Sequence, residues 1–194
     1  MRDQHFGEGR YEESERVIQE LLGLPPQEVV SVHGEADEAA ADWARLESPE
    51  TYLGYERTES FASPGGVRAG EARVFTAPER LQLNQWALSG SWTVREDRVV
   101  SNEAGGRILF RFHARDLHLV LRRAEGAGPV PLQVLLEGGA PGPAHGVDVD
   151  RDGRGVLEDD RMYQLVRQPG AVEDRTFSIA FQEPGVEAYV FTFG

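Results

Sequence analysis

The chain has 194 residues, no cysteine and a formal net charge of −13 at pH 7, from 20 Lys+Arg and 33 Asp+Glu. This charge argues against nucleic acid as a partner, because no basic patch is set apart to offset the repulsion from phosphate groups. Without cysteine, the chain can carry neither a disulfide nor thiol redox chemistry of its own. No apolar run reaches the roughly 18 residues of a membrane span, so we expect no direct membrane insertion. The N-terminal segment is too charged to be a secretory signal.

An amphipathic helix is predicted near the start of the chain. Its apolar face is formed by residues three and four apart, namely Tyr11, Ser14, Val17, Ile18, Leu21 and Leu22. Gly23 ends the helix, and Pro25-Pro26 prevents it from continuing. An isolated helix of about 13 residues is marginal in water. We therefore expect its apolar stripe to pack on the rest of the chain, with a homodimer as the alternative.

Residues 24–47 are predicted to be a linker with one short helix near residues 36–46. The irregular character continues to about Pro78. A structureless segment of that length would be unusual, so we expect much of it to pack along the larger domain. Tyr52, Tyr55 and Phe61 are the expected anchors.

From about Leu81 onward the apolar side chains recur every second residue, as is typical of half-buried strands. The segments concerned are LQLNQWAL, WTV, RVVSN, RILFRF, LHLVLR, PLQVLLEG, RMYQLVRQ, RTFSIAFQ and VEAYVFTFG. Turn residues separate them, which gives about nine or ten strands. The fold class predicted is mainly β, an antiparallel β-sandwich of jelly-roll type.

Several blocks in one order resemble a known family. HFGEGRYEESERVIQELL is similar to the last strand and C-terminal helix of a thioredoxin-like domain. SPETYLGYERTESFAS, LQLNQWALSGSWTV, RILFRFHARDLHLVL, AHGVDVD, MYQLVRQPG and VEAYVFTFG resemble the C-terminal region of DipZ-like thiol-disulfide interchange proteins. That family places a thioredoxin-like domain and then a β-sandwich similar to carbohydrate-binding modules after a membrane-embedded unit.

The resemblance implies a division into residues 1–23, the end of a thioredoxin-like domain; 24–47, a linker; and 48–194, the β-sandwich. It implies a ligand- or partner-binding domain of an extracytoplasmic, periplasmic thiol-disulfide system, with carbohydrate as one ligand class. A cytoplasmic location stays open because the chain shows no signal peptide. Thiol exchange needs a thiolate, which this chain cannot supply, so we expect no enzyme. The alternatives are a structural domain that docks a thioredoxin-like partner and, third, a glycoside-active enzyme.

GVDVDRDGRG contains the most specific metal motif, because Asp148, Asp150 and Asp152 followed by Gly153 match the opening of a calcium loop. The twelfth position is Asp159 where a bidentate Glu is wanted, and no helix flanks the loop. Asp-Gly between two apolar segments is also a hairpin signal, since Gly accepts a positive φ. We therefore expect no obligatory cofactor, with calcium as the alternative to a plain hairpin.

His113 and His118 would face each other across a hairpin if the strands beside them paired. Two imidazoles do not complete a zinc site, which takes three or four protein ligands. His145 is a further candidate ligand. The alternative is that these histidines are polar surface positions of half-buried strands.

Carbohydrate-binding modules use exposed flat rings beside hydrogen-bonding side chains, because a pyranose has an apolar face and polar edges. The rings proposed for this role are Trp86, Trp92 and Tyr163, and the amides are Asn84, Gln85 and Gln164. The alternative makes both tryptophans core residues. Alternation places Trp86 on the same side as Gln82 and Asn84, which favours exposure.

Overall fold

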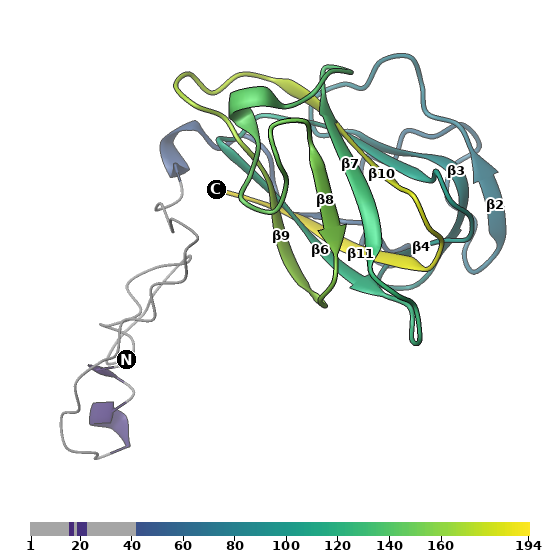
Figure 1. Ribbon diagram of the computed structural model, residues 1–194, viewed down its shortest axis with the longest axis horizontal. Helices are drawn as coiled ribbons and strands as arrows, with labels where there is room; N and C mark the ends of the chain where they lie inside the picture. Colours follow the sequence, from purple (N-terminus) through teal and green to yellow (C-terminus); the bar gives the residue numbers. More distant parts are fainter. Residues whose placement is uncertain (1–15, 18, 23–41) are drawn as a thin grey trace. The chain divides into compact units, whose positions relative to one another are not determined.

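The computed structural model describes residues 16, 17, 19–22 and 42–194 (Figure 1). Contacts divide the chain into two units, Met1–Ala41 and Asp42–Gly194. In the first unit, residues 16, 17 and 19–21 are helical, and the side chains of Leu21 and Leu22 are exposed. The rest of the predicted helix lies outside the described residues, as do residues 24–41 of the predicted linker. How the apolar stripe packs, and whether the chain forms a homodimer, stay predictions.

The second unit contains eleven strands and two short 3₁₀ turns. The strands are β1 Thr51–Tyr52, β2 Ala72–Phe75, β3 Trp86–Val94, β4 Val99–Ser101, β5 Arg107–Phe112, β6 Asp116–Arg123, β7 Val130–Leu136, β8 Arg154–Leu157, β9 Arg161–Arg167, β10 Arg175–Phe181 and β11 Val186–Phe193. The 3₁₀ turns are η1 Trp43–Arg45 and η2 Gly142–Ala144. No helix within the described residues is long and apolar enough to cross a membrane.

The strands form two layers that share β3. Sheet B has the order β8-β7-β10-β5 and ends on the N-terminal half of β3. Sheet A begins with the C-terminal half of β3 and continues β4-β11-β6-β9, while β2 pairs with β3 and β1 pairs with β11. The pairings between these strands are all antiparallel, which confirms a mainly β, sandwich-like fold. The jelly-roll type stays a prediction.

Strand β3 passes from one layer to the other at Gly90. Before this glycine, Trp86–Ser89 pair with β5; after it, Trp92–Val94 pair with β4. Gly90 has φ +92°, and a Cβ there would lie 3.1 Å from the Cα of Gly106. A side chain would therefore be both strained and crowded. LQLNQWAL and WTV are predicted as two strands. Because the chain continues through Gly90 without a turn, both contribute to the single strand β3.

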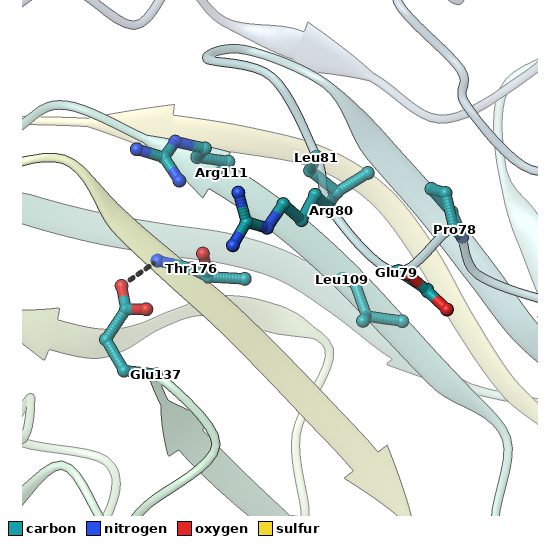
Figure 2. A pocket seen from close by; sticks show the side chains of 8 residues that line it. All are labelled: Pro78, Glu79, Arg80, Leu81, Leu109, Arg111, Glu137 and Thr176. Carbon is teal, nitrogen blue, oxygen red and sulfur yellow. Dashed lines mark hydrogen bonds between the residues drawn. The ribbon is translucent and has the colours of Figure 1, made fainter.

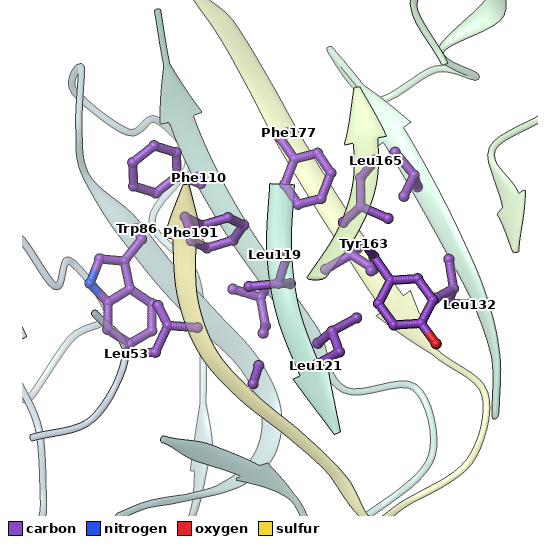
Figure 3. Close-up of a cluster of buried hydrophobic side chains, with 14 of the residues drawn as sticks. Leu53, Trp86, Phe110, Leu119, Leu121, Leu132, Tyr163, Leu165, Phe177 and Phe191 are labelled. Carbon is purple, nitrogen blue, oxygen red and sulfur yellow. The ribbon is translucent and has the colours of Figure 1, made fainter. Parts of the chain in front are cut away.

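The core lies between the two sheets and is rich in aromatic rings (Figure 3). Phe110 of sheet B contacts Phe191 of sheet A, with ring centroids 5.0 Å apart, and Phe177 contacts the same ring at 5.9 Å. The predicted alternation is confirmed in β5, β7 and β10, where every second side chain is buried. It breaks in β11 because a bulge lies between Ala188 and Phe191, which leaves Tyr189 half-buried.

Candidate ligand-binding site

The three rings predicted to contact a sugar are core residues. Trp86 and Trp92 have no exposed surface, and Tyr163 is 1% exposed; Figure 3 shows Trp86 and Tyr163 among the buried side chains. The indole N–H of Trp86 donates to the Glu59 carbonyl at 3.0 Å, and that of Trp92 donates to the Ser89 carbonyl at 2.9 Å. The expected exposure of these rings is therefore wrong, and the core alternative for the tryptophans is confirmed.

The alternation argument fails at Trp86 because the residues before it form a turn. The N–H of Gln85 donates to the Gln82 carbonyl at 3.0 Å, and Asn84 has φ +64°. The two predicted ligand-binding amides brace this turn. Asn84 Nδ2 donates to the Glu47 carbonyl at 3.1 Å, and Gln85 Oε1 accepts from the N–H of Gln82 at 2.9 Å. Their part in ligand binding, and that of half-buried Gln164, stays a prediction.

The predicted calcium-loop carboxylates are each held by groups of the protein; they are Asp148, Asp150 and Asp152. The first accepts from Arg161 Nη2 at 2.6 Å and from the backbone N–H of Gln164 at 2.7 Å. The second accepts from the N–H of Arg154 at 2.8 Å, and the third pairs with the same arginine at 3.2 Å. Within the described part of the chain, no group of three or more His, Asp or Glu side chains could hold a metal ion. The geometry therefore does not support the calcium alternative.

The hairpin alternative for the same segment is correct only at the turn. Gly153 has φ +83°, and its N–H donates to the Asp150 carbonyl at 2.8 Å. Residues 147–149 do not form a strand, however, and β8 pairs with β7 instead. The Asp-Gly sequence thus marks a tight turn that leads into β8.

The predicted facing of His113 and His118 is wrong because the strands beside them lie in different sheets. β5 pairs with β10 and β3, whereas β6 pairs with β11 and β9. His113 Nδ1 lies 2.8 Å from Asp174 Oδ1, and His145 Nδ1 lies 2.9 Å from the carbonyl oxygen of Val149. The histidines therefore do not converge on one site.

A pocket of about 400 Å³ lies on the outer face of sheet B (Figure 2). Its walls come from the loop before β3, from β5 and β10, and from the turn after β7. The lining residues are Pro78, Glu79, Arg80, Leu81, Leu109, Arg111, Glu137 and Thr176. Small-molecule pockets typically measure about 300–1,000 Å³. The pocket therefore has the size of a small-ligand site.

The same alternation that builds the core builds the floor of this pocket. Ile108, Phe110 and Phe112 face the core, so Leu109 and Arg111 face outward. Thr176 lies directly opposite Arg111 in the pairing of β10 with β5. Two strands far apart in sequence thus place a short hydroxyl side chain beside a guanidinium group.

One wall of the pocket is the loop Pro78–Leu81, which the sandwich holds by a single buried side chain. Leu81 is 6% exposed and belongs to the core, while neighbouring Arg80 is exposed. Figure 2 shows the Arg80 side chain on the same side of the pocket as Arg111. In residues 42–194 we find no ion pair or hydrogen bond that engages the Arg80 side chain.

The opposite wall is Glu137, held in an unusual backbone conformation. It has φ +49° in a two-residue turn, closed by hydrogen bonds of 2.9 Å between Leu136 and Gly139. Gly, Asn and Asp are the residues that favour such a turn, so glutamate is strained there. Its Oε1 accepts from the backbone N–H of Thr176 at 2.6 Å. The carboxylate is thereby fixed at the edge of the pocket.

The Asp174 carboxylate forms an ion pair with Arg111, whose Nη2 lies 3.3 Å from Oδ2. Its other oxygen, Oδ1, lies 2.8 Å from His113 Nδ1. The hydrogen bond from His113 lowers the pKa of the Asp174 carboxyl below its ordinary value, and Arg111 lowers it further. The carboxylate is therefore ionised at neutral pH. It holds Arg111 at the pocket while leaving N–H groups of that guanidinium available.

A second hollow of about 710 Å³ lies on sheet A beside the turn that joins β3 and β4. Its central arginine is already neutralised: Arg98 pairs with Asp97 at 2.6 Å and with Glu187 at 3.3 Å. Burial and the neighbouring Glu187 raise the pKa of Tyr189, whose hydroxyl donates to that carboxylate at 2.9 Å. The side chains of Arg98, Glu187 and Tyr189 are thus engaged with one another, and we place the candidate site on sheet B.

The sequence patterns missed this pocket. Alternation indicates that Leu109, Arg111 and Thr176 face outward, but it does not identify which strands are neighbours. The positions of Arg80 and Glu137 depend on loop and turn conformations that no motif marks. The detectable signal was arginine on the outer side of a strand whose other side is entirely apolar.

The chain matches a family model described as "Thioredoxin like C-terminal domain" over residues 48–194. It is also 28% identical over 123 residues to Protein DipZ of Mycobacterium bovis (strain ATCC BAA-935 / AF2122/97). The match to Protein DipZ of Mycobacterium tuberculosis (strain CDC 1551 / Oshkosh) has the same identity and length. The aligned region covers 60% of this chain and 17% of each DipZ protein.

Proposed function

Because the chain belongs, over residues 48–194, to the family of thioredoxin-like C-terminal domains, we propose that this part is a binding module of an extracytoplasmic thiol-disulfide system. We propose further that the module is non-catalytic and that its ligand is a carbohydrate. The extracytoplasmic location rests on the likeness to DipZ. The absence of catalysis rests on the lack of cysteine, since thiol exchange requires a thiolate.

The observation that carries the ligand proposal is the arrangement of donors and acceptors in the sheet B pocket. Arg80 and Arg111 offer N–H donors, the Glu137 carboxylate offers acceptors, and the Thr176 hydroxyl can serve as either. Saccharide hydroxyl groups need donors and acceptors close together. Two paired strands and a two-residue turn fix Arg111, Thr176 and Glu137 before a ligand arrives, which reduces the entropic cost of binding.

The site proposed here differs in mode from the ring-stacking site expected from the sequence. Trp86, Trp92 and Tyr163 offer no accessible ring face, so hydrogen bonds would supply the recognition. Leu109 provides the apolar part of the floor. Such a site is expected to bind weakly and to discriminate by hydroxyl and charge pattern.

A glycan array tests the proposal directly. The wild-type chain is expected to bind a subset of glycans. Thr176→Trp, which fills the pocket from its floor, should abolish that signal. Val74→Trp is the matched control, because Val74 is 70% exposed on β2 and lies outside the pocket. Both variants should keep the circular dichroism spectrum of the wild type.

Two results would overturn the ligand proposal: no glycan signal at all, or a signal that Thr176→Trp leaves intact. Binding of a purified thioredoxin-like protein without glycan binding would favour the docking role instead. Turnover of chromogenic glycosides would overturn the non-catalytic part of the proposal and support the glycoside-active alternative.

A further inference from the structure

The sheet B pocket is lined by two arginine side chains, of which one is paired with a carboxylate and the other is not. The Arg80 guanidinium lacks an ion pair within residues 42–194, and Arg111 has one, with Asp174 at 3.3 Å. Both side chains line the pocket, and Figure 2 shows the two guanidinium groups on the same side of it. Like charges in one pocket repel each other less when an anion lies between them.

The arginines of the sandwich fall into those that pair with a carboxylate and those that do not. Besides Arg111, the paired ones are Arg45, Arg98, Arg115, Arg122, Arg154, Arg161, Arg167 and Arg175. With a net charge of −13, carboxylates are abundant on this chain. Arg80 is one of the arginines without a carboxylate partner among the described residues, and it lines the same pocket as Arg111.

Two carboxylates also line the pocket. That of Glu137 accepts from the N–H of Thr176 at 2.6 Å and keeps its negative charge. Figure 2 shows the Glu79 carboxylate at the other end of the pocket, beside Pro78 and away from the two guanidinium groups. The pocket thus combines two guanidinium groups, of Arg80 and Arg111, with an accepting carboxylate, that of Glu137.

We propose that this pocket binds an acidic saccharide, with the carboxylate of a uronic acid residue held between Arg80 and Arg111. This inference rests on the proposed function and names the ligand class for the same site. The planar guanidinium fork matches carboxylate geometry and forms shorter, stronger hydrogen bonds than a neutral donor does. The Thr176 hydroxyl and the Glu137 carboxylate contact hydroxyl groups of the same ligand.

The negative charge of the whole chain limits which acidic saccharides bind. Long polyanions are repelled by a protein of charge −13. A short oligomer with its carboxylate at Arg80 and Arg111 avoids most of that repulsion. Binding should weaken as salt rises, because both guanidinium groups are accessible to solvent ions.

Isothermal titration calorimetry on the full chain tests the inference with three probes. These are a galacturonic acid trisaccharide, the neutral galactose trisaccharide of the same linkage, and sodium sulfate. The acidic trisaccharide should bind at least about tenfold more tightly than the neutral one, as expected for a charge-assisted hydrogen bond. Arg80→Gln should remove that preference, and Arg80→Lys should keep part of it. Arg68→Gln is the matched control, since Arg68 is an exposed arginine outside the pocket.

The outcomes separate this inference from the proposed function. Equal affinity for the acidic and neutral trisaccharides overturns the inference and leaves carbohydrate binding in place. Arg80-dependent binding of sulfate alone supports an anion subsite but overturns the saccharide as its ligand. No heat from any saccharide, together with an empty glycan array, overturns the proposed function and this inference with it. A loss in Arg68→Gln equal to that in Arg80→Gln overturns the assignment to the pocket.

Discussion

Replacement of Tyr163 by phenylalanine should destabilise the sandwich without affecting a ligand. The Tyr163 hydroxyl accepts from the backbone N–H groups of Glu158 and Asp159 at 3.1 and 3.0 Å and donates to the Asp159 carbonyl at 2.9 Å. It thereby fixes the turn between β8 and β9. Removing it takes away a partner of two backbone donors. Both donors belong to exposed residues, so water can replace part of the loss, and we expect a cost of about 1–3 kcal/mol.

Thermal and urea denaturation followed by circular dichroism measure this cost. For a domain of this size, about 2–4 °C of melting temperature corresponds to each kcal/mol. Tyr52→Phe is the control: its hydroxyl donates to Glu50 at 2.9 Å on an exposed side, and the change should stay within about 0.5 kcal/mol. Equal stability of Tyr163→Phe and Tyr52→Phe would refute the structural role assigned to Tyr163.

Three further changes probe the turn, the pocket and the metal alternative. Gly153→Ala should lower the free energy of unfolding, measured by urea denaturation, more than Gly126→Ala does. Both glycines have positive φ, but only at Gly153 would a Cβ collide with the Val134 carbonyl oxygen. Equal losses of stability in the two variants would contradict this. Asp174→Asn should lose about 0.2–1 kcal/mol at pH 7. Since the folded pKa of Asp174 is lowered from 3.8, this difference should vanish as the pH falls through that lowered value; a difference that persists there would contradict the ion pair. Calcium should leave the melting temperature unchanged, and a rise that Asp148→Asn removes would restore the calcium loop.

Much of the architecture could be predicted because a half-buried strand has a simple period. In RILFRF and RTFSIAFQ every second residue is apolar, and those residues face the core. The predicted segments missed β1, β2 and β8. β1 has two residues, and in four-residue β2 and β8 only the last side chain is buried, so that none of the three shows a periodic signal. The separate segments LQLNQWAL and WTV belong to one strand, because Gly90 lies within β3.

The functional residues were harder to predict because their positions depend on tertiary pairing. The pocket combines Arg80, Arg111, Glu137 and Thr176, which a sequence shows only as four unrelated positions. The motifs that stood out instead, the tryptophans and the aspartate run, have structural partners. Large aromatic rings are valuable in a sandwich core, and Asp-Gly is as much a turn signal as a metal signal.

The most direct test of the central claim is a ¹H–¹⁵N correlation spectrum of the full chain titrated with the galacturonic acid trisaccharide. We expect chemical-shift changes at the amides of Leu109, Arg111 and Thr176 and at the Arg80 side chain. The indole N–H signals of buried Trp86 and Trp92 should stay in place. Changes centred on Arg98 and the sheet A hollow, with the pocket signals unmoved, would contradict the site described here.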